Sequence, residues 1–194
     1  CNILKAIEKT YSLVDYAISK INKIPGFEVK GKEHFLKHGS YDFDKTKVVI
    51  SLQNLDISGF DLYFLIEKES KIQFELAEIH EVLAIFSVGT TKEHVNLMVE
   101  GLKKISTKHY KKNLEKKKHK VDLSFPFAIV RPRSAFHAPG VVEKIEDCLG
   151  KISKEMVMIY PPGIPLICPG EVWSQDLVSR VLEYEKTGMT LLSS

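Results

Sequence analysis

The most informative stretch of the sequence lies near its C-terminal end, where residues 156–173 read MVMIYPPGIPLICPGEVW. Two runs with strand-forming composition, residues 156–160 and 165–167, enclose a Pro-Pro-Gly turn. A Pro-Gly-Glu turn follows, and Ser174 then offers an N-cap for a final helix that is predicted to end near Gly188. Because proline fixes the backbone at both turns, the sequence predicts a stiff pair of strands followed by a helix.

Glu171 is the polar residue that this stretch holds beside its second turn. Rigid turns next to buried strands suit a site that keeps one polar group in place. The alternative is a helix-entry loop, in which the Glu171 carboxylate only favours the positive end of the final helix. The physical argument alone favours the loop. The neighbouring Cys168 lies in an apolar run and is predicted to be a buried, unreactive thiol.

The first 105 residues are predicted to form a compact α/β unit, a small mixed sheet covered by helices. An apolar stripe with helical spacing predicts a first helix that reaches Ile21 and is closed by the Pro25-Gly26 pair. Ser58 and Thr90 each open a capping-box pattern and predict two more helices, the second ending near Ile105. Strands are predicted at residues 27–31, 47–53, 72–76 and 82–88, the last covered on both faces, with a loop at 32–46.

A lysine-rich block separates this unit from the C-terminal part of the chain. The whole chain has a net charge of +3, yet residues 102–120 hold nine Lys and one Glu. We interpret residues 106–120 as a solvated basic linker. Nucleic acid is the less favoured partner, because only Tyr110 and two His supply rings for stacking. Residues 121–194 hold seven of the eight Pro and predict a smaller α/β region, with a strand at 125–131 and a helix at 141–149.

Composition excludes several classes of protein. No apolar run approaches the roughly 20 residues of a membrane span, so no membrane association is expected. Three Cys without a CxxC pair argue against a zinc ribbon or a disulfide scaffold, and indicate a reducing, cytoplasmic location. His80 lies among glutamates, but in a predicted turn, so no metal site is expected. The chain opens at Cys1 without a signal-peptide pattern, and we expect a fragment of a longer protein.

The motifs of the C-terminal part resemble one enzyme family. The order Tyr-Pro-Pro-Gly-Ile-Pro at 160–165 and Pro-Gly-Glu at 169–171 resembles the signature near the end of the Orn/Lys/Arg decarboxylases, which are pyridoxal-phosphate enzymes. The stretches 131–136 (RPRSAF) and 150–156 (GKISKEM) resemble two further segments of that family, and residues 45–89 match in pattern. The resemblance implies that residues 1–105 are the small domain of an aspartate-aminotransferase-like fold and that residues 121–194 are the C-terminal decarboxylase region.

The resemblance also implies a function. The full-length enzyme would decarboxylate lysine, ornithine or arginine with pyridoxal phosphate, would contribute to diamine and polyamine formation, and would be a homo-oligomer, a dimer or larger. The Ser-x-His-Lys segment that carries the family's Schiff-base lysine is missing, because His119-Lys120 has Lys117 in place of the Ser. No catalytic or cofactor-binding residue is therefore assigned to this chain. The chain is expected to be inactive alone and to need the large cofactor domain as its partner.

Within this resemblance, Glu171 is the candidate that binds the distal cation of a basic amino-acid substrate. Its scaffold is predicted to consist of Tyr160, Pro161, Pro162, Gly163, Pro165, Pro169 and Gly170. Arg133 is a candidate anion-binding residue, although an internal ion pair is the favoured interpretation. The alternative function is a separately expressed, non-catalytic domain for assembly or anion binding.

Overall fold

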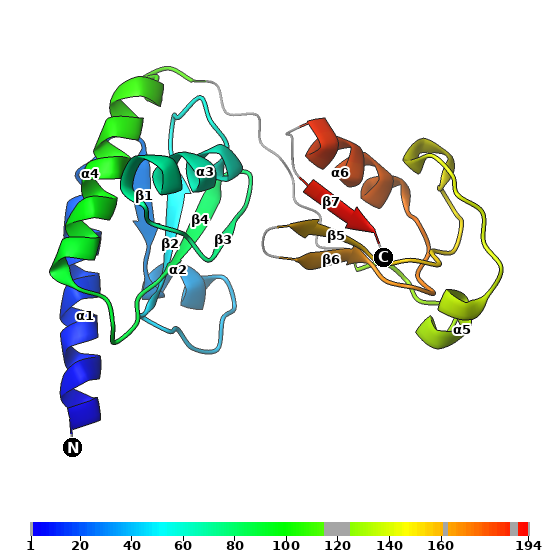
Figure 1. Cartoon of the computed structure of the whole chain (residues 1–194), viewed down its shortest axis with the longest axis horizontal. Helices are drawn as coiled ribbons and strands as arrows, with labels where there is room; N and C mark the ends of the chain where they lie inside the picture. Colours follow the sequence, from blue (N-terminus) through cyan, green and yellow to red (C-terminus); the bar gives the residue numbers. More distant parts are fainter. Residues whose placement is uncertain (1, 115–124, 161–162, 187–189, 194) are drawn as a thin grey trace. The chain divides into compact units, whose positions relative to one another are not determined.

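The computed structural model describes residues 2–114, 125–160, 163–186 and 190–193. It divides into two compact units, Cys1–Lys117 and Lys118–Ser194, each with its own sheet and helices (Figure 1). The α/β (α+β) class expected from the sequence is confirmed. No helix in the described ranges combines the length and the apolar character that a membrane crossing requires.

The first unit contains a four-stranded sheet. Its strands lie in the order β1 (Phe27–Lys30), β2 (Lys47–Leu52), β4 (Glu81–Ile85) and β3 (Leu76–Ala77). Every pairing between them is antiparallel. The prediction of a mixed sheet is therefore wrong. Strands β2 and β3, which are connected by a helix, run in the same direction. They do not pair with each other, because β4 lies between them and pairs with both.

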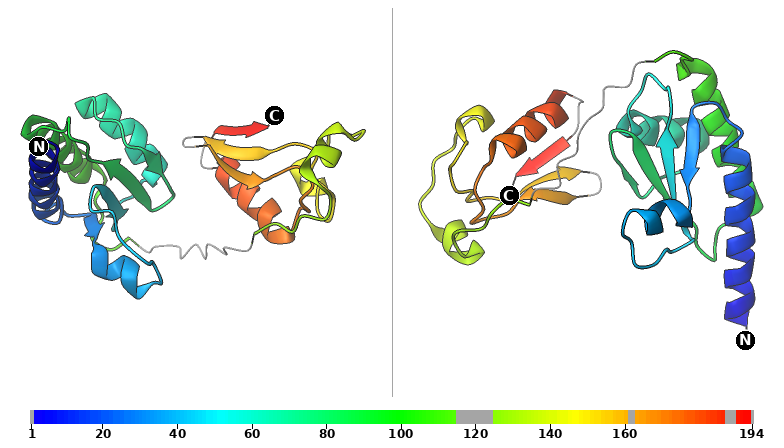
Figure 2. Two further views of the ribbon diagram at one scale, coloured as in Figure 1. Left: turned by 90° about the horizontal axis from the view of Figure 1, so that it is seen from below. Right: turned by 180° about the vertical axis from the view of Figure 1, so that it is seen from behind.

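Three helices cover one face of this sheet, as Figures 1 and 2 show: α1 (Asn2–Ile21), α3 (Gly59–Ser70) and α4 (Lys92–His109). The predicted apolar stripe of α1 is fully buried only in the second half of the helix, where Val14 and Ile21, together with Ala17, are inaccessible to solvent. In the first half, Ile3 is 66% exposed and Tyr11 is 40% exposed. The other helices and the sheet also contribute fully buried side chains, including Ile50, Leu62, Ile66 and Leu102. The core therefore lies between the helices and the sheet face that carries Ile50.

The helix caps follow the sequence closely. Ser58 and Asp61 form the predicted reciprocal capping box at α3. At α4 the box is shifted by one residue, because Thr91 pairs with His94. The Thr90 hydroxyl instead accepts a hydrogen bond from the backbone N–H of Ser87, which closes the turn before the helix.

Four features of the first unit differ from the prediction. Residues 32–46 include a short helix, α2 (Lys32–Lys37). Only Leu76 of the predicted strand 72–76 is in β3. Strand β4 stops at Ile85, whose side chain is 46% exposed, so β4 is not covered on both faces. Helix α4 continues to His109, four residues into the segment interpreted as a linker.

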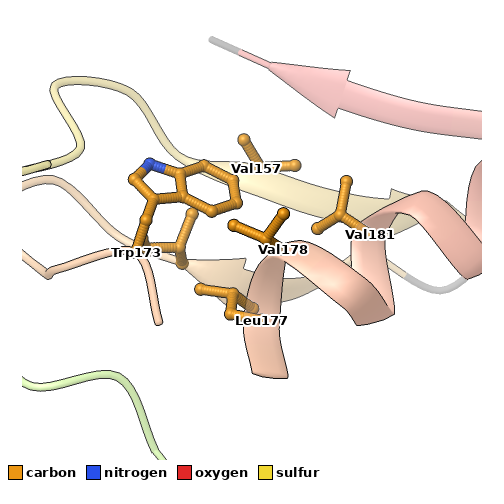
Figure 3. Packing of buried hydrophobic residues seen from close by; sticks show 6 residues of the cluster. Val157, Trp173, Leu177, Val178 and Val181 are labelled. Carbon is orange, nitrogen blue, oxygen red and sulfur yellow. The ribbon is translucent and has the colours of Figure 1, made fainter. Parts of the chain in front are cut away.

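The second unit contains a three-stranded antiparallel sheet in the order β6 (Ile164–Ile167), β5 (Val157–Tyr160) and β7 (Thr190–Ser193). Helix α6 (Gln175–Lys186) packs on it, and the predicted N-cap is present, because the N–H of Leu177 donates to the Ser174 hydroxyl. Its predicted end at Gly188 lies outside the described residues. Figure 3 shows the core, in which Trp173 points toward Val157 and toward three residues of α6: Leu177, Val178 and Val181.

The segment before β5 is less regular than predicted. Residues 125–131 form only an isolated bridge between Ala128 and Glu171, because Pro126 and Pro132 interrupt the backbone donors. Pro132 instead begins a short helix, α5 (Pro132–His137), at the helix position that suits proline. The predicted helix at 141–149 is reduced to one turn of 3-10 helix, Ile145–Asp147. Strand β7 was not predicted.

Candidate functional site

Glu171 closes the turn on which the predicted site depends. The backbone N–H of Cys168 donates to Oε2 of Glu171 at 2.6 Å, and the N–H of Glu171 donates to the carbonyl of Cys168 at 3.2 Å. Between them, Gly170 has a φ of 91°, and a Cβ at this position would collide with the carbonyl oxygen of Val130. Only glycine fits both the backbone angle and the space, so the Pro169-Gly170 pair fixes where the carboxylate points.

The same turn connects two other segments of the second unit. The backbone of Ser153 pairs with it twice, donating to the carbonyl of Glu171 at 2.8 Å and accepting from the N–H of Gly170 at 2.8 Å. The carbonyl of Gly170 accepts from Ile129 at 3.0 Å, and Val172 donates to the carbonyl of Phe127 at 3.0 Å. Residues 168–172 therefore connect the segment at 127–129 with Ser153 through backbone hydrogen bonds.

The Glu171 carboxylate thus has a local partner, and that partner is not the N-terminus of α6. A half-buried carboxylate accepts up to about four hydrogen bonds, so the bond from Cys168 leaves acceptor capacity for a ligand. A carboxylate whose position is set by its own loop is preorganised for a cationic group. The geometry is compatible with substrate binding and also with a purely structural role.

The Cys168 thiol is held in its neutral form. Burial raises its pKa, and the negative charge of Glu171 raises it further. A thiolate is the nucleophilic form of cysteine, so the raised pKa makes Cys168 a poor nucleophile. The side chain is half-buried rather than fully buried.

The predicted scaffold residues do not gather around Glu171. Tyr160 ends β5 and is 54% exposed, and Gly163, with a φ of 91°, donates its N–H to the carbonyl of Ile159 at 2.7 Å. Gly163 directly precedes β6 and the Pro169-Gly170 turn follows it, so the two lie at opposite ends of this strand. Four strand residues span about 13 Å at roughly 3.3 Å each. Pro165 lies within β6, opposite Met158. Pro161 and Pro162 lie outside the described residues.

Two further sequence candidates stand apart from Glu171. Arg133 is exposed on α5, and among the described residues it has no ion-pair partner. The pair His119-Lys120 lies outside the described residues. Across the ranges that the structure describes, no three His, Cys, Asp or Glu side chains are grouped as a metal site would need.

The family comparison matches the C-terminal unit. The model of the Orn/Lys/Arg decarboxylase C-terminal domain matches residues 115–189. Among curated proteins, the arginine decarboxylase of Halalkalibacterium halodurans is 33% identical over 181 residues, which are 93% of this chain and 37% of that protein. The arginine decarboxylase of Bacillus subtilis is 29% identical over 94% of this chain and 37% of its own length. The chain therefore spans little more than a third of these relatives.

Solved structures give the same fold. A lysine decarboxylase from Francisella novicida superposes with a TM-score of 0.69 and 18% identity, covering 97% of this chain and 38% of its own. The constitutive lysine decarboxylase of Escherichia coli superposes with a TM-score of 0.66 and 15% identity, again over 97% of this chain and 38% of its own. At these identities the superpositions establish the fold alone.

Proposed function

Residues 115–189 match the model of the Orn/Lys/Arg decarboxylase C-terminal domain, and on that premise we propose that the whole protein decarboxylates a basic amino acid: lysine, ornithine or arginine. The observation that carries the proposal is the similarity to arginine decarboxylases, which extends through both compact units. The products would be the diamines or agmatine from which polyamines are made. Residues 1–105 would be the small domain of the fold, and residues 121–194 its C-terminal region.

The cofactor of the full-length enzyme would be pyridoxal phosphate, which supplies an electron sink when carbon dioxide leaves the amino acid. Residues 1–194 lack the Ser-x-His-Lys segment that would hold it covalently. The cofactor would therefore be held by the large domain, which is the proposed partner of this chain, and the chain alone would be inactive. The free thiols of Cys148 and Cys168 support a reducing, cytoplasmic location. The enzyme is proposed to be a homo-oligomer, a dimer or larger.

The part that this chain would play is recognition of the distal cation of the substrate. Glu171 would present its carboxylate to the ammonium or guanidinium group, held in position by the N–H of Cys168 and the Pro169-Gly170 turn. A charge-assisted hydrogen bond of this kind is stronger than a neutral one. Its geometry would favour a basic side chain over a neutral one of similar size.

The test of the proposed function is the release of carbon dioxide by the full-length protein loaded with pyridoxal phosphate. L-arginine, L-lysine and L-ornithine are supplied separately, with L-norleucine as an uncharged control. We expect turnover of at least one basic substrate and none of norleucine. The chain 1–194 alone should release nothing, and borohydride should fix no pyridoxal phosphate to it. A full-length enzyme that is inactive on all three substrates would contradict the proposal.

The alternative is a separately expressed domain for assembly or anion binding. It is supported by the two compact units, each of which has its own buried core. The length of the natural protein separates the two functions, because the proposed decarboxylase would be a longer polypeptide that also contains the large domain, as the length of its curated relatives suggests. A mass measured for the natural protein close to 22.0 kDa would favour the alternative.

A further inference from the structure

A basic pocket lies in the first unit, where the end of α1 meets the C-terminal half of α4. The two helices lie side by side in Figures 1 and 2. The cavity has a volume of about 660 Å³. Its charged lining consists of Lys20 from the last turn of α1, Lys23 from the turn after α1, and Lys103 from α4. None of its described lining residues is acidic.

The floor of this pocket is rigid and partly apolar. Ile24 is buried, and its N–H donates to the carbonyl of Ile21 at 2.9 Å. The hydroxyl of Ser106 donates to the carbonyl of Pro25 at 2.5 Å, which joins α4 to the turn after α1. A lining fixed by such bonds loses little conformational freedom when a ligand binds.

Tyr110 forms one side of the pocket and is also held by its backbone. Its N–H donates to the carbonyl of Ser106 at 2.9 Å, and the residue bridges to Leu55. The side chain remains 37% exposed. As a lining residue, Tyr110 adds an aromatic side chain with a hydroxyl group to the pocket.

The helix ends do not cancel the charge of the lysines. The C-terminus of a helix carries a partial negative charge on its free carbonyls, which would repel an anion. At the end of α1 three of these carbonyls are occupied, because Ile18, Lys20 and Ile21 accept from Asn22, Lys23 and Ile24. Lys103 pairs with Glu100 at 2.8 Å, but both side chains are more than half exposed, so the pair is weak. The ammonium of Lys20 lies over the ring of Tyr16, 5.4 Å from its centroid, a contact that is also weak at an exposed site.

We propose that this pocket binds a small molecule that carries phosphate groups. The side chains of Lys20, Lys23 and Lys103 are exposed and would turn from their present positions to meet an anion with two or more charges. Ile24 and Pro25 of the lining would accommodate an uncharged part of the ligand. Lysine binds phosphate as a point charge, whereas carboxylates are best met by the planar fork of arginine, and no arginine lines the pocket. The site is independent of Glu171, which belongs to the other unit.

The test uses the chain 1–194 and inorganic pyrophosphate as the probe, with binding measured by calorimetry and by amide chemical shifts. We expect one saturable site whose shifts centre on residues 20–25 and 103–110. Lys20→Gln and Lys103→Gln should each weaken binding by about three-fold to ten-fold, the range for a partly exposed charge contact. Tyr110→Phe should weaken it by less.

The matched controls are Lys104→Gln and Lys108→Gln, which remove the same charge from the same helix. Lys104 and Lys108 point to Glu69 instead of the pocket, at 4.0 Å and 3.1 Å. They should change binding by less than about two-fold. The proposal is overturned if pyrophosphate shows no saturable binding up to about 10 mM. It is equally overturned if the controls weaken binding as much as the pocket variants, which would mean that the lysine-rich surface attracts anions without a defined site.

Discussion

The backbone N–H of Cys168 donates to the carboxylate of Glu171 across the Pro169-Gly170 turn, at 2.6 Å. The two residues are three apart, and each also pairs through its backbone with the other. The residue proposed to meet the substrate therefore also closes its own loop. Its two roles must be separated by variants that remove one and keep the other.

Glu171→Gln removes the charge and keeps an oxygen that accepts from Cys168. If Glu171 binds the substrate cation, this variant of the full-length enzyme should lose about 10-fold to 150-fold in kcat/KM, since a charge-assisted bond contributes about 1.5–3 kcal/mol. Its melting temperature should stay close to that of the unmodified enzyme. Steady-state decarboxylation and a thermal melt measure the two effects.

Glu171→Ala is the control for the structural role, because it removes both the charge and the acceptor. It should lower the melting temperature as well as kcat/KM. If Glu171→Gln instead keeps normal kcat/KM while only Glu171→Ala lowers the melting temperature, Glu171 has a structural role in its loop and does not bind the substrate.

Gly170→Ala should destabilise the second unit by more than a change of backbone angle alone. A positive φ costs a non-glycine residue about 1 kcal/mol, and the new Cβ would also collide with the carbonyl of Val130. Gly150→Ala is the matched control, because Gly150 has a φ of 76° but open space around its Cβ position. We expect losses in unfolding free energy of about 1 kcal/mol for Gly150→Ala and at least about 2 kcal/mol for Gly170→Ala, measured by urea denaturation. Equal losses would mean that the collision is relieved by movement of residue 130.

Leu177→Ala should unfold the second unit and leave the first unit folded. Leu177 is buried against Trp173 in the core of that unit, and such truncations cost about 2–5 kcal/mol (Figure 3). Amide hydrogen exchange should lose protection in β5, β6 and α6 and keep it in α1 and α4. Leu149→Ala, at a half-exposed leucine of the same unit, should change little. Loss of protection in both units would show that they fold cooperatively.

The end of α4 should loosen in acid. The pKa of Asp56 lies below its ordinary value, because His109 hydrogen-bonds to its carboxylate and Lys111 adds a positive charge. A carboxyl group with a lowered pKa stabilises the fold above its unfolded value of about 3.9, and that stabilisation is lost as the pH falls through the folded value. Carboxyl carbon shifts should therefore give a higher pKa for Asp56 in His109→Gln than in the unmodified chain. Identical titration curves in the two proteins would contradict the assignment.

The sequence predicted the elements whose signals are local. The capping box of Ser58 and the Pro25-Gly26 end of α1 each depend on residues a few positions apart, and both are present. The paired strands around the Pro-Pro-Gly turn were likewise predicted from their own composition. Local patterns succeed here because hydrogen bonds within a few residues decide the structure.

The features that failed depend on distant partners. Strand β7 carries no signal of its own and exists through its pairing with β5, some thirty residues earlier. Conversely, the apolar residues of 141–149 suggested a helix, yet Val141 is 81% exposed and has no core to pack on among the described residues. The basic pocket was missed for the same reason, because Lys20 and Lys103 meet only through the packing of α1 on α4.

The backbone hydrogen bonds that join Tyr110 and Lys111 to the loop after β2 have a mechanical consequence. Tyr110 bridges to Leu55, and the N–H of Lys111 donates to the carbonyl of Asn54 at 2.8 Å, so the chain leaves the first unit while bound to the loop after β2. A pull transmitted along the backbone from residue 112 onward loads these bonds before it reaches the last turn of α4. A force applied to the chain beyond residue 112 is thus carried first by the hydrogen bonds to the loop at Asn54, and the last turn of α4 is protected from it.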